Sequence, residues 1–116
     1  MDFSTFRDAN VRRCESAFHP LKAWSPTDWA TALAGETGEA CNEVKKLRRL
    51  AESPETLVDE TKYGEYQSRV NALGDELGDI VAYADLLAAR FGLDLGECVR
   101  RKFNEVSDRR KSSIKL

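Results

Sequence analysis

The sequence predicts an all-α protein of four helices, and three observations support that fold class. Apolar residues recur three and four positions apart along most of the chain, which is the period of amphipathic helices. No stretch shows the two-residue alternation of strands, and no Asn-Gly pair marks a β-hairpin. The three prolines lie between the periodic stretches or at the start of one. A chain of 116 residues is long enough for a single helical domain, and we expect residues 1–116 to form one.

The first two predicted helices are bounded by recognisable end signals. The first covers residues 3–18, and the proline after His19 ends it because a residue that precedes proline disfavours helical backbone. The second covers residues 26–50. Ser25 is its N-cap, a proline follows at the first helical position, and the acid Asp28 complements the helix dipole.

The remaining two helices follow a less regular segment. Residues 51–66 contain proline, glycine and few large apolar side chains, so we expect an insertion or a mobile connection. The third helix covers residues 68–90, and Gly92 is a good C′ residue. The fourth begins with a capping box at Asp94 and continues to about residue 109. We expect residues 111–116 to form a flexible tail.

Composition restricts the functional classes. Charged residues make up 33% of the chain but the net charge is only −2, which argues against a nucleic-acid surface. The three cysteines, Cys14, Cys41 and Cys98, are widely spaced and fit neither a zinc site nor a disulfide framework; Cys41 and Cys98 are expected to be small buried hydrophobes. No apolar run has transmembrane length, and the acidic start is not a signal peptide. We expect a soluble, cytoplasmic protein with no membrane partner.

Acidic residues recur at helical spacing in two segments of the chain. Glu36, Glu39 and Glu43 lie three and four residues apart and project from one arc of the second helix. Forty residues later, Glu76 and Asp79 repeat the spacing of the first two acids. Two such helices packed antiparallel would bring both acidic edges to one cleft. Acidic pairs on solvated helix faces are common, but two copies favour a site.

Each acidic segment also carries apolar residues and interior glycines. The expected core-facing stripes, beside the acids, are Leu33, Thr37, Ala40, Val44 and Leu47 in the second helix and Leu73, Leu77, Ile80, Ala84 and Leu87 in the third. The acids are therefore expected to flank the core. Glycines destabilise helix interiors, so Gly35, Gly38, Gly74 and Gly78 indicate close helix approach or ligand access.

The ligand chemistry of these segments indicates a hard cation. Carboxylates without histidine suit Mg²⁺, or Mn²⁺ as a substitute, better than zinc or copper. A di-iron helical bundle would need Glu-x-x-His pairs, and the sequence contains none. Magnesium held by a few carboxylates usually keeps positions open for water and for substrate phosphates. Phosphoryl or nucleotidyl chemistry is the expectation.

The acidic motifs resemble those of a known family. Gly35-Glu-Thr-Gly-Glu39 followed by Glu76-Leu-Gly-Asp79 looks like the ExxE…ExxD signature of the MazG-like all-α nucleoside triphosphate pyrophosphohydrolases. The resemblance spans residues 18–110. It implies a four-helix bundle assembled as a homodimer or as a homotetramer built from two dimers, and Mg²⁺-dependent hydrolysis of an NTP or dNTP to the monophosphate and pyrophosphate, as in nucleotide-pool house-cleaning.

The resemblance also implies roles for individual residues. The expected metal ligands are Glu36, Glu39, Glu76 and Asp79; the expected catalytic residues are Glu39, Glu43 and Lys102; and the expected substrate-binding residues are Trp24, Lys102, Asn104 and Arg109. Glu43 would be a further ligand or a base that orients water. Trp24 would stack on the nucleobase, since an indole offers a flat face, whereas Trp29 is expected to anchor the core or a dimer interface.

Two alternative functions remain open at the level of sequence. Phosphoribosyl-ATP pyrophosphohydrolases have similar acidic helices and form the alternative within enzymes. A catalytically silent helical dimerisation module, in which the acids are solvated or bind a regulatory cation, is the alternative from another class. Release of pyrophosphate from a panel of nucleotides separates these readings.

Overall fold

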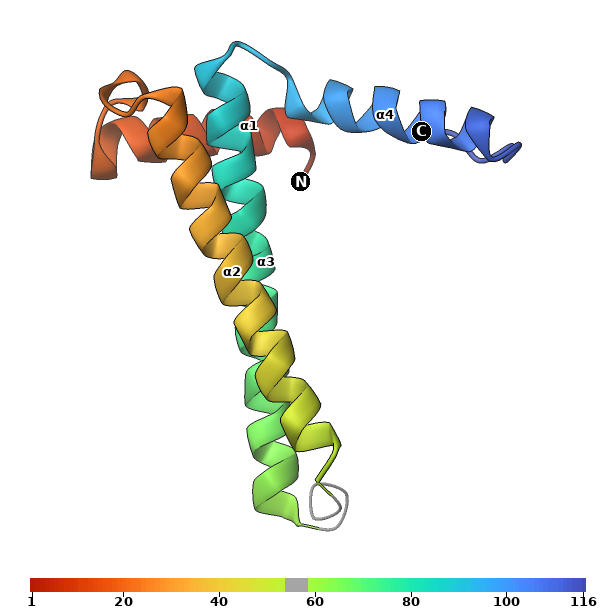
Figure 1. Cartoon of the computed structure of the whole chain (residues 1–116). Helices are drawn as coiled ribbons and strands as arrows, with labels where there is room; N and C mark the ends of the chain where they lie inside the picture. Colours follow the sequence, from red (N-terminus) through yellow and green to blue (C-terminus); the bar gives the residue numbers. More distant parts are fainter. Residues whose placement is uncertain (54–58) are drawn as a thin grey trace. The chain divides into compact units, whose positions relative to one another are not determined.

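The computed structural model describes residues 1–53 and 59–116 and shows an all-helical chain (Figure 1). Its elements are α1 (Phe3–Arg13), a π-helix (Cys14–Phe18), a 3₁₀-helix (Leu21–Ala23), α2 (Pro26–Ala51), α3 (Glu60–Arg90) and α4 (Leu95–Arg109). The described residues contain no strand, so the predicted all-α class is confirmed. No helix among them is long and apolar enough to cross a membrane.

The chain divides into two units, which are described separately. The terminal unit contains Met1–Trp29 and Ala84–Leu116, and the hairpin unit contains Ala30–Tyr83. The hairpin unit therefore holds most of α2 and α3, and the terminal unit holds α1, α4 and the short helices. The four-helix bundle and its assembly stay predictions.

An aromatic cluster forms part of the core of the terminal unit. Trp29 is 2% exposed, and its indole Nε1 donates a hydrogen bond to the Leu21 carbonyl at 3.0 Å. Its ring lies 4.7 Å from that of Trp24 and 5.4 Å from that of His19, measured between centroids. The expectation that Trp29 anchors the core is confirmed.

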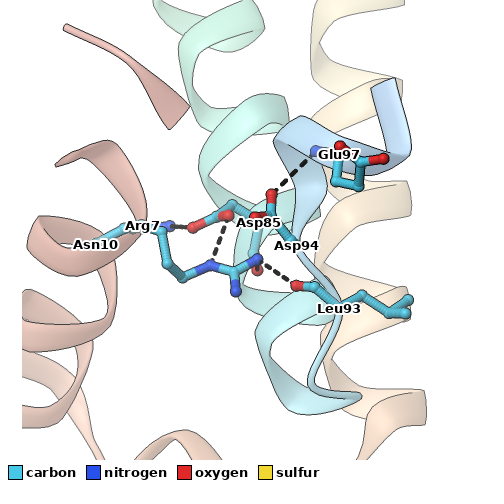
Figure 2. A network of polar contacts seen from close by, with 6 residues as sticks. All are labelled: Arg7, Asn10, Asp85, Leu93, Asp94 and Glu97. Carbon is cyan, nitrogen blue, oxygen red and sulfur yellow. Dashed lines mark hydrogen bonds and ion pairs between the residues drawn. The ribbon is translucent and has the colours of Figure 1, made fainter. Parts of the chain in front are cut away.

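A buried carboxylate joins α1 to the carboxyl-terminal part of α3 (Figure 2). Asp85 is 1% exposed and accepts hydrogen bonds from Arg7 Nε at 2.7 Å and from Asn10 Nδ2 at 3.1 Å. Arg7 also donates through Nη2 to the Leu93 carbonyl, at 2.8 Å, in the turn after α3. The charge of Asp85 is thus paired and hydrogen-bonded, as a buried charge requires.

The helix ends in the terminal unit follow the predicted capping chemistry. Ser25 and Asp28 cap α2 reciprocally: the Asp28 N–H donates to Ser25 Oγ at 3.2 Å, and the Ser25 N–H donates to Asp28 Oδ2 at 2.9 Å. After α3, Gly92 has φ of 67°, which is the left-handed conformation of a C′ residue. Asp94 caps α4 by accepting from the Glu97 N–H at 3.0 Å (Figure 2).

The hairpin unit pairs α2 and α3 as antiparallel neighbours along a charged seam (Figure 1). Shielded positions recur with a seven-residue repeat: Leu33, Glu36, Ala40, Glu43, Leu47 and Leu50 in α2, and Tyr66, Arg69, Leu73, Glu76, Ile80 and Tyr83 in α3. Three of the acids therefore occupy the seam itself. The expectation that the acids flank the core is wrong for these three.

The predicted apolar stripes share Leu33, Ala40, Leu47, Leu73 and Ile80 with the seam, but the positions between these were placed one residue too far along the chain. Val44 and Leu77 were expected in the core but are each 51% exposed, whereas Glu43 is buried. Alanine-rich helices offer weakly hydrophobic positions on two faces, so the apolar pattern alone does not fix the rotation. Cys41 is likewise exposed, not buried as expected.

Two segments are more ordered than the sequence suggested. The helix α3 begins at Glu60, because Asp59 caps it by accepting from the Thr61 N–H at 2.8 Å; residues 54–58 of the predicted connection lie outside the described residues. The expected flexible tail folds back onto α4. Leu116 receives a hydrogen bond from Asn104 Nδ2 at 3.1 Å and donates one to Asn104 Oδ1 at 2.9 Å.

Candidate metal centre

Three carboxylates from the two long helices meet in the hairpin unit. Glu36 of α2 and Glu76 and Asp79 of α3 each offer an oxygen, and these oxygens all lie within 4.8 Å of one another. We call these three residues the acid cluster. The antiparallel pairing predicted from the repeated motif therefore brings the two acidic segments together. Glu39 is exposed and lies one helical turn after Glu36.

The electrostatics of the acid cluster oppose full ionisation. Burial, followed by interactions with the carboxyl groups of Glu39 and Glu36, raises the pKa of Glu76 to about 7. Burial, followed by the charges of Glu39 and Asp79, also raises the pKa of Glu36. A carboxylic acid that titrates near neutral pH is unusual, because the reference pKa of glutamic acid is about 4.3. The cluster therefore holds a proton more readily than isolated carboxylates do.

An unsatisfied atom shows what the cluster lacks. Glu76 Oε2 is buried and has no hydrogen-bond partner among the described residues. Buried carboxylate oxygens without donors are costly, and in proteins such charges are usually paired or bound to a metal. A divalent cation would satisfy this oxygen and relieve the repulsion that raises the pKa. The oxygen-only ligand set fits Mg²⁺ or Mn²⁺.

Glu43, expected to assist the metal ligands, has a different environment. It is 9% exposed, and its Oε1 accepts from Lys46 Nζ at 3.2 Å while Arg69 Nη1 lies 3.3 Å from its Oε2. Burial opposes ionisation of Glu43, but the hydrogen bonds and charges of Lys46 and Arg69 outweigh it and lower its pKa. The three closely placed oxygens of the acid cluster do not include one from Glu43. Its catalytic role stays a prediction.

No family model, curated protein or solved structure matches the chain. The chemistry of the acid cluster is therefore what indicates function, together with the resemblance of its motifs to ExxE…ExxD. The glycines near these motifs are not required by helix packing: a Cβ atom at Gly35, Gly38, Gly74 or Gly78 would meet nothing within 4 Å among the described residues. Close approach of α2 and α3 to each other is therefore not the reason for these glycines.

The predicted substrate-binding residues all lie in the terminal unit. Lys102 is exposed on α4 and pairs with Glu105 at 2.7 Å. Arg109 is exposed near the end of α4, and Asn104 holds the backbone of the tail. Trp24 is partly buried against His19, with 4.6 Å between ring centroids. Their roles toward a substrate stay predictions.

The sequence interpretation did not include the two cations nearest to Glu43. Neither Lys46 nor Arg69 was assigned a role from the sequence. One signal was available: Arg69 lies seven residues before Glu76, which is two turns along the same face of a helix. That position is informative only once the seam is known. The predicted apolar stripe of the third helix did not include Arg69.

Proposed function

We propose that the chain is a Mg²⁺-dependent nucleoside triphosphate pyrophosphohydrolase that converts an NTP or dNTP to the monophosphate and pyrophosphate. The observation that supports this most directly is the acid cluster, in which oxygens of Glu36, Glu76 and Asp79 lie within 4.8 Å of one another. The buried Oε2 of Glu76, which has no hydrogen-bond partner among the described residues, supports the proposal that this cluster binds a cation. The resemblance to the MazG-like family supplies the reaction.

In this proposal the side chains have separate tasks. Glu36, Glu76 and Asp79 hold the ion, with Glu39 as a further ligand from the exposed edge of α2. When bound, the ion supplies Lewis-acid stabilisation of the phosphate oxygens and activation of a water molecule. The resemblance assigns to Lys102 of α4 the stabilisation of charge that develops on the leaving pyrophosphate. All of these roles suit a substrate that carries a high negative charge.

The base and the remaining phosphates would be bound by other residues of the terminal unit. The resemblance assigns Trp24 to stacking on the nucleobase and Asn104 and Arg109 to polar contacts. The indole of Trp24 already packs against two other rings, since its centroid lies 4.6 Å from that of His19 and 4.7 Å from that of Trp29. A ring that is fixed in this way loses little entropy when a base stacks on it.

We also propose that the chain functions as a homodimer, or as a homotetramer built from two dimers. Beside the seam, the hairpin unit exposes an apolar stripe formed by Val44 of α2 and Val70, Leu77 and Val81 of α3, which are 51%, 38%, 51% and 44% exposed. In an antiparallel pair, positions just past the seam in the two helices lie on the same side. A stripe of this kind on both helices favours association with a second copy.

Release of pyrophosphate from a panel of NTPs and dNTPs, with and without Mg²⁺, tests the proposed reaction. We expect release only with the metal, and we expect Glu39→Gln and Asp79→Asn to abolish turnover while circular dichroism stays helical. Asp75→Asn is the matched control, because Asp75 is an exposed acid of α3 outside the acid cluster. Full turnover by the two site variants would contradict the metal assignment. Release from phosphoribosyl-ATP alone would favour the related enzyme.

A further inference from the structure

Two cations of the hairpin unit share one buried carboxylate. Lys46 Nζ lies 3.2 Å from Glu43 Oε1, and Arg69 Nη1 lies 3.4 Å from Oε1 and 3.3 Å from Oε2 of the same residue. Two positive charges thus face one negative charge. The side chain of Glu43 is 12% exposed, whereas those of Lys46 and Arg69 are 35% and 37% exposed. The excess positive charge is therefore on the side that solvent can reach.

The contacts to Glu43 leave much of Arg69 unused. Charge-assisted N–H···O bonds are usually about 2.7 to 2.9 Å long, so the contacts at 3.3 and 3.4 Å are loose. Both contacts come from Nη1, and no hydrogen bond from Nε or Nη2 is found among the described residues. A guanidinium that keeps a free edge can bind two oxygens of a phosphate group at once.

The spacing between Arg69 and Glu76 along α3 is similar to the length of a polyphosphate. Arg69 and Glu76 share one face of α3, and seven residues of α-helix cover about 10 Å. A divalent ion held by Glu76, a chain of three phosphates and one hydrogen-bond length together have a length of that order. Both residues belong to the seam of the same unit, so one linear anion can reach both.

We propose that Arg69, with Lys46 beside it, is the binding site for the terminal phosphate of the substrate. This assignment rests on the proposed function, because it takes the acid cluster as the site of the metal and of the phosphates nearer the nucleoside. Glu43 holds the two cations in place and weakens their attraction for an anion. The site would then favour a triphosphate, which can reach Arg69 from the acid cluster, over a monophosphate, which cannot.

Calorimetric titration of the full chain with inorganic tripolyphosphate, at fixed free Mg²⁺, tests this site without requiring hydrolysis. We expect Arg69→Ala to raise the Kd about tenfold, as the loss of one charge-assisted phosphate contact does, and Arg69→Lys to recover part of that loss. Arg48→Ala is the matched control, because Arg48 is an exposed cation of α2 that pairs with Glu52. It should leave the Kd unchanged.

A second variant distinguishes a binding role from a structural one. Glu43→Gln removes the competing charge, so we expect tripolyphosphate to bind several-fold more tightly to this variant, whereas a purely structural ion pair predicts weaker binding in both Arg69→Ala and Glu43→Gln. This readout also remains if Arg69→Ala does not fold. Unchanged binding by Arg69→Ala, weaker binding by Glu43→Gln, or no binding by the wild type would each overturn the assignment.

The same titration separates this inference from the proposed reaction. If no nucleotide releases pyrophosphate but tripolyphosphate binding follows the expected pattern, the pyrophosphohydrolase proposal fails and the anion site stands. If pyrophosphate is released with Mg²⁺ but Arg69→Ala binds tripolyphosphate as the wild type does, the reaction stands and Arg69 has no phosphate role.

Discussion

One carboxylate of each unit, Asp85 in the terminal unit and Glu76 in the hairpin unit, can be compared, and their environments are opposite. In the terminal unit, Asp85 is 1% exposed and receives hydrogen bonds from Arg7 and Asn10. In the hairpin unit, Glu76 has a buried Oε2 without a partner among the described residues, and its pKa is raised to about 7. Asp85 has a positive partner and hydrogen-bond donors within its own unit, whereas Oε2 of Glu76 has no partner among the described residues.

Both units expose large apolar side chains, such as Phe18 at 71% in the terminal unit, but their buried apolar residues differ. The terminal unit buries Trp29 and Cys14 almost completely, at 2% exposure each. The hairpin unit is a pair of helices that leaves Val44 and Leu77 half exposed. One unit has the buried aromatic core and the satisfied polar network of a folding unit. The other has a buried carboxylate oxygen without a partner among the described residues and a partly exposed apolar stripe.

The largest effect, on the free energy of unfolding, is expected from removing the paired carboxylate of Asp85. Asp85→Ala leaves the guanidinium of Arg7 without its ion partner, and removal of one member of a buried pair typically costs about 3 to 5 kcal/mol. Chemical denaturation with urea measures this loss as a lower free energy of unfolding. Asp8→Ala, an exposed acid of α1, is the control and should change stability little. Equal stability of both variants would mean that the Asp85 network does not stabilise α1.

A charged residue in the apolar stripe of the hairpin unit should dissociate the proposed dimer. Leu77→Glu places a carboxylate in the proposed interface, where the lost apolar contact and the desolvated charge together cost about 2 to 3 kcal/mol. Sedimentation velocity should show a dimer for the wild type and a monomer of about 13 kDa for the variant. Asn71→Glu, on the opposite side of α3 from the seam, should remain dimeric. A monomeric wild type with full activity would show that one chain forms the whole site.

Lys102 provides a test of the cation that the resemblance assigns to catalysis. Lys102→Ala should lower kcat/KM roughly 10- to 100-fold, which is about 1.4 to 2.7 kcal/mol, with an effect on kcat as well as KM. Steady-state kinetics with the preferred nucleotide measure it. Arg101 lies about 100° around α4 from Lys102, so Arg101→Ala should have a smaller effect. If Arg101→Ala is the more damaging change, the phosphate contact belongs to the neighbouring face of α4.

The smallest expected effect is on the pH dependence of stability, to which Glu76 of the hairpin unit should contribute. The pKa of Glu76 in the folded chain is about 7, above its value of about 4.3 in an unfolded chain. The folded state therefore binds more protons between these values, and stability falls as pH rises from about 4 to above 7. Glu76→Gln should flatten this part of the profile in metal-free denaturation experiments. A profile that Glu76→Gln does not change would show that Glu76 ionises normally.

The sequence predicted those parts of the fold that depend on local chemistry. Ser25 with Asp28, and Gly92 after α3, are end signals that act over a few residues, and both occur as expected. The repeated acidic motif predicted that the two acidic segments meet if their helices pack antiparallel, and the structure brings Glu36 and Glu76 together. These predictions depended on spacing within a helix, which a single sequence records directly.

The parts that the sequence did not predict depend on contacts between distant residues. The ion pair between Arg7 and Asp85 joins positions 78 residues apart, and its only local signal is one acid within the apolar end of α3. The seam was predicted only in part, because small residues lie on two faces of α2 and α3. The acids Glu36, Glu43 and Glu76 were not expected in the seam, and Arg69 was assigned no role.

A calorimetric titration of the metal-free wild type with Mg²⁺ at pH 7.5 tests the central claim, that the acid cluster is a cation site, most directly. We predict saturable binding that releases protons, because Glu76 is partly protonated at this pH and a metal ligand must be ionised. Glu76→Gln should weaken the binding at least about tenfold, as loss of one carboxylate ligand does, and the control Asp75→Asn should not. Absence of binding in the wild type, or equal binding by Glu76→Gln, would contradict the claim.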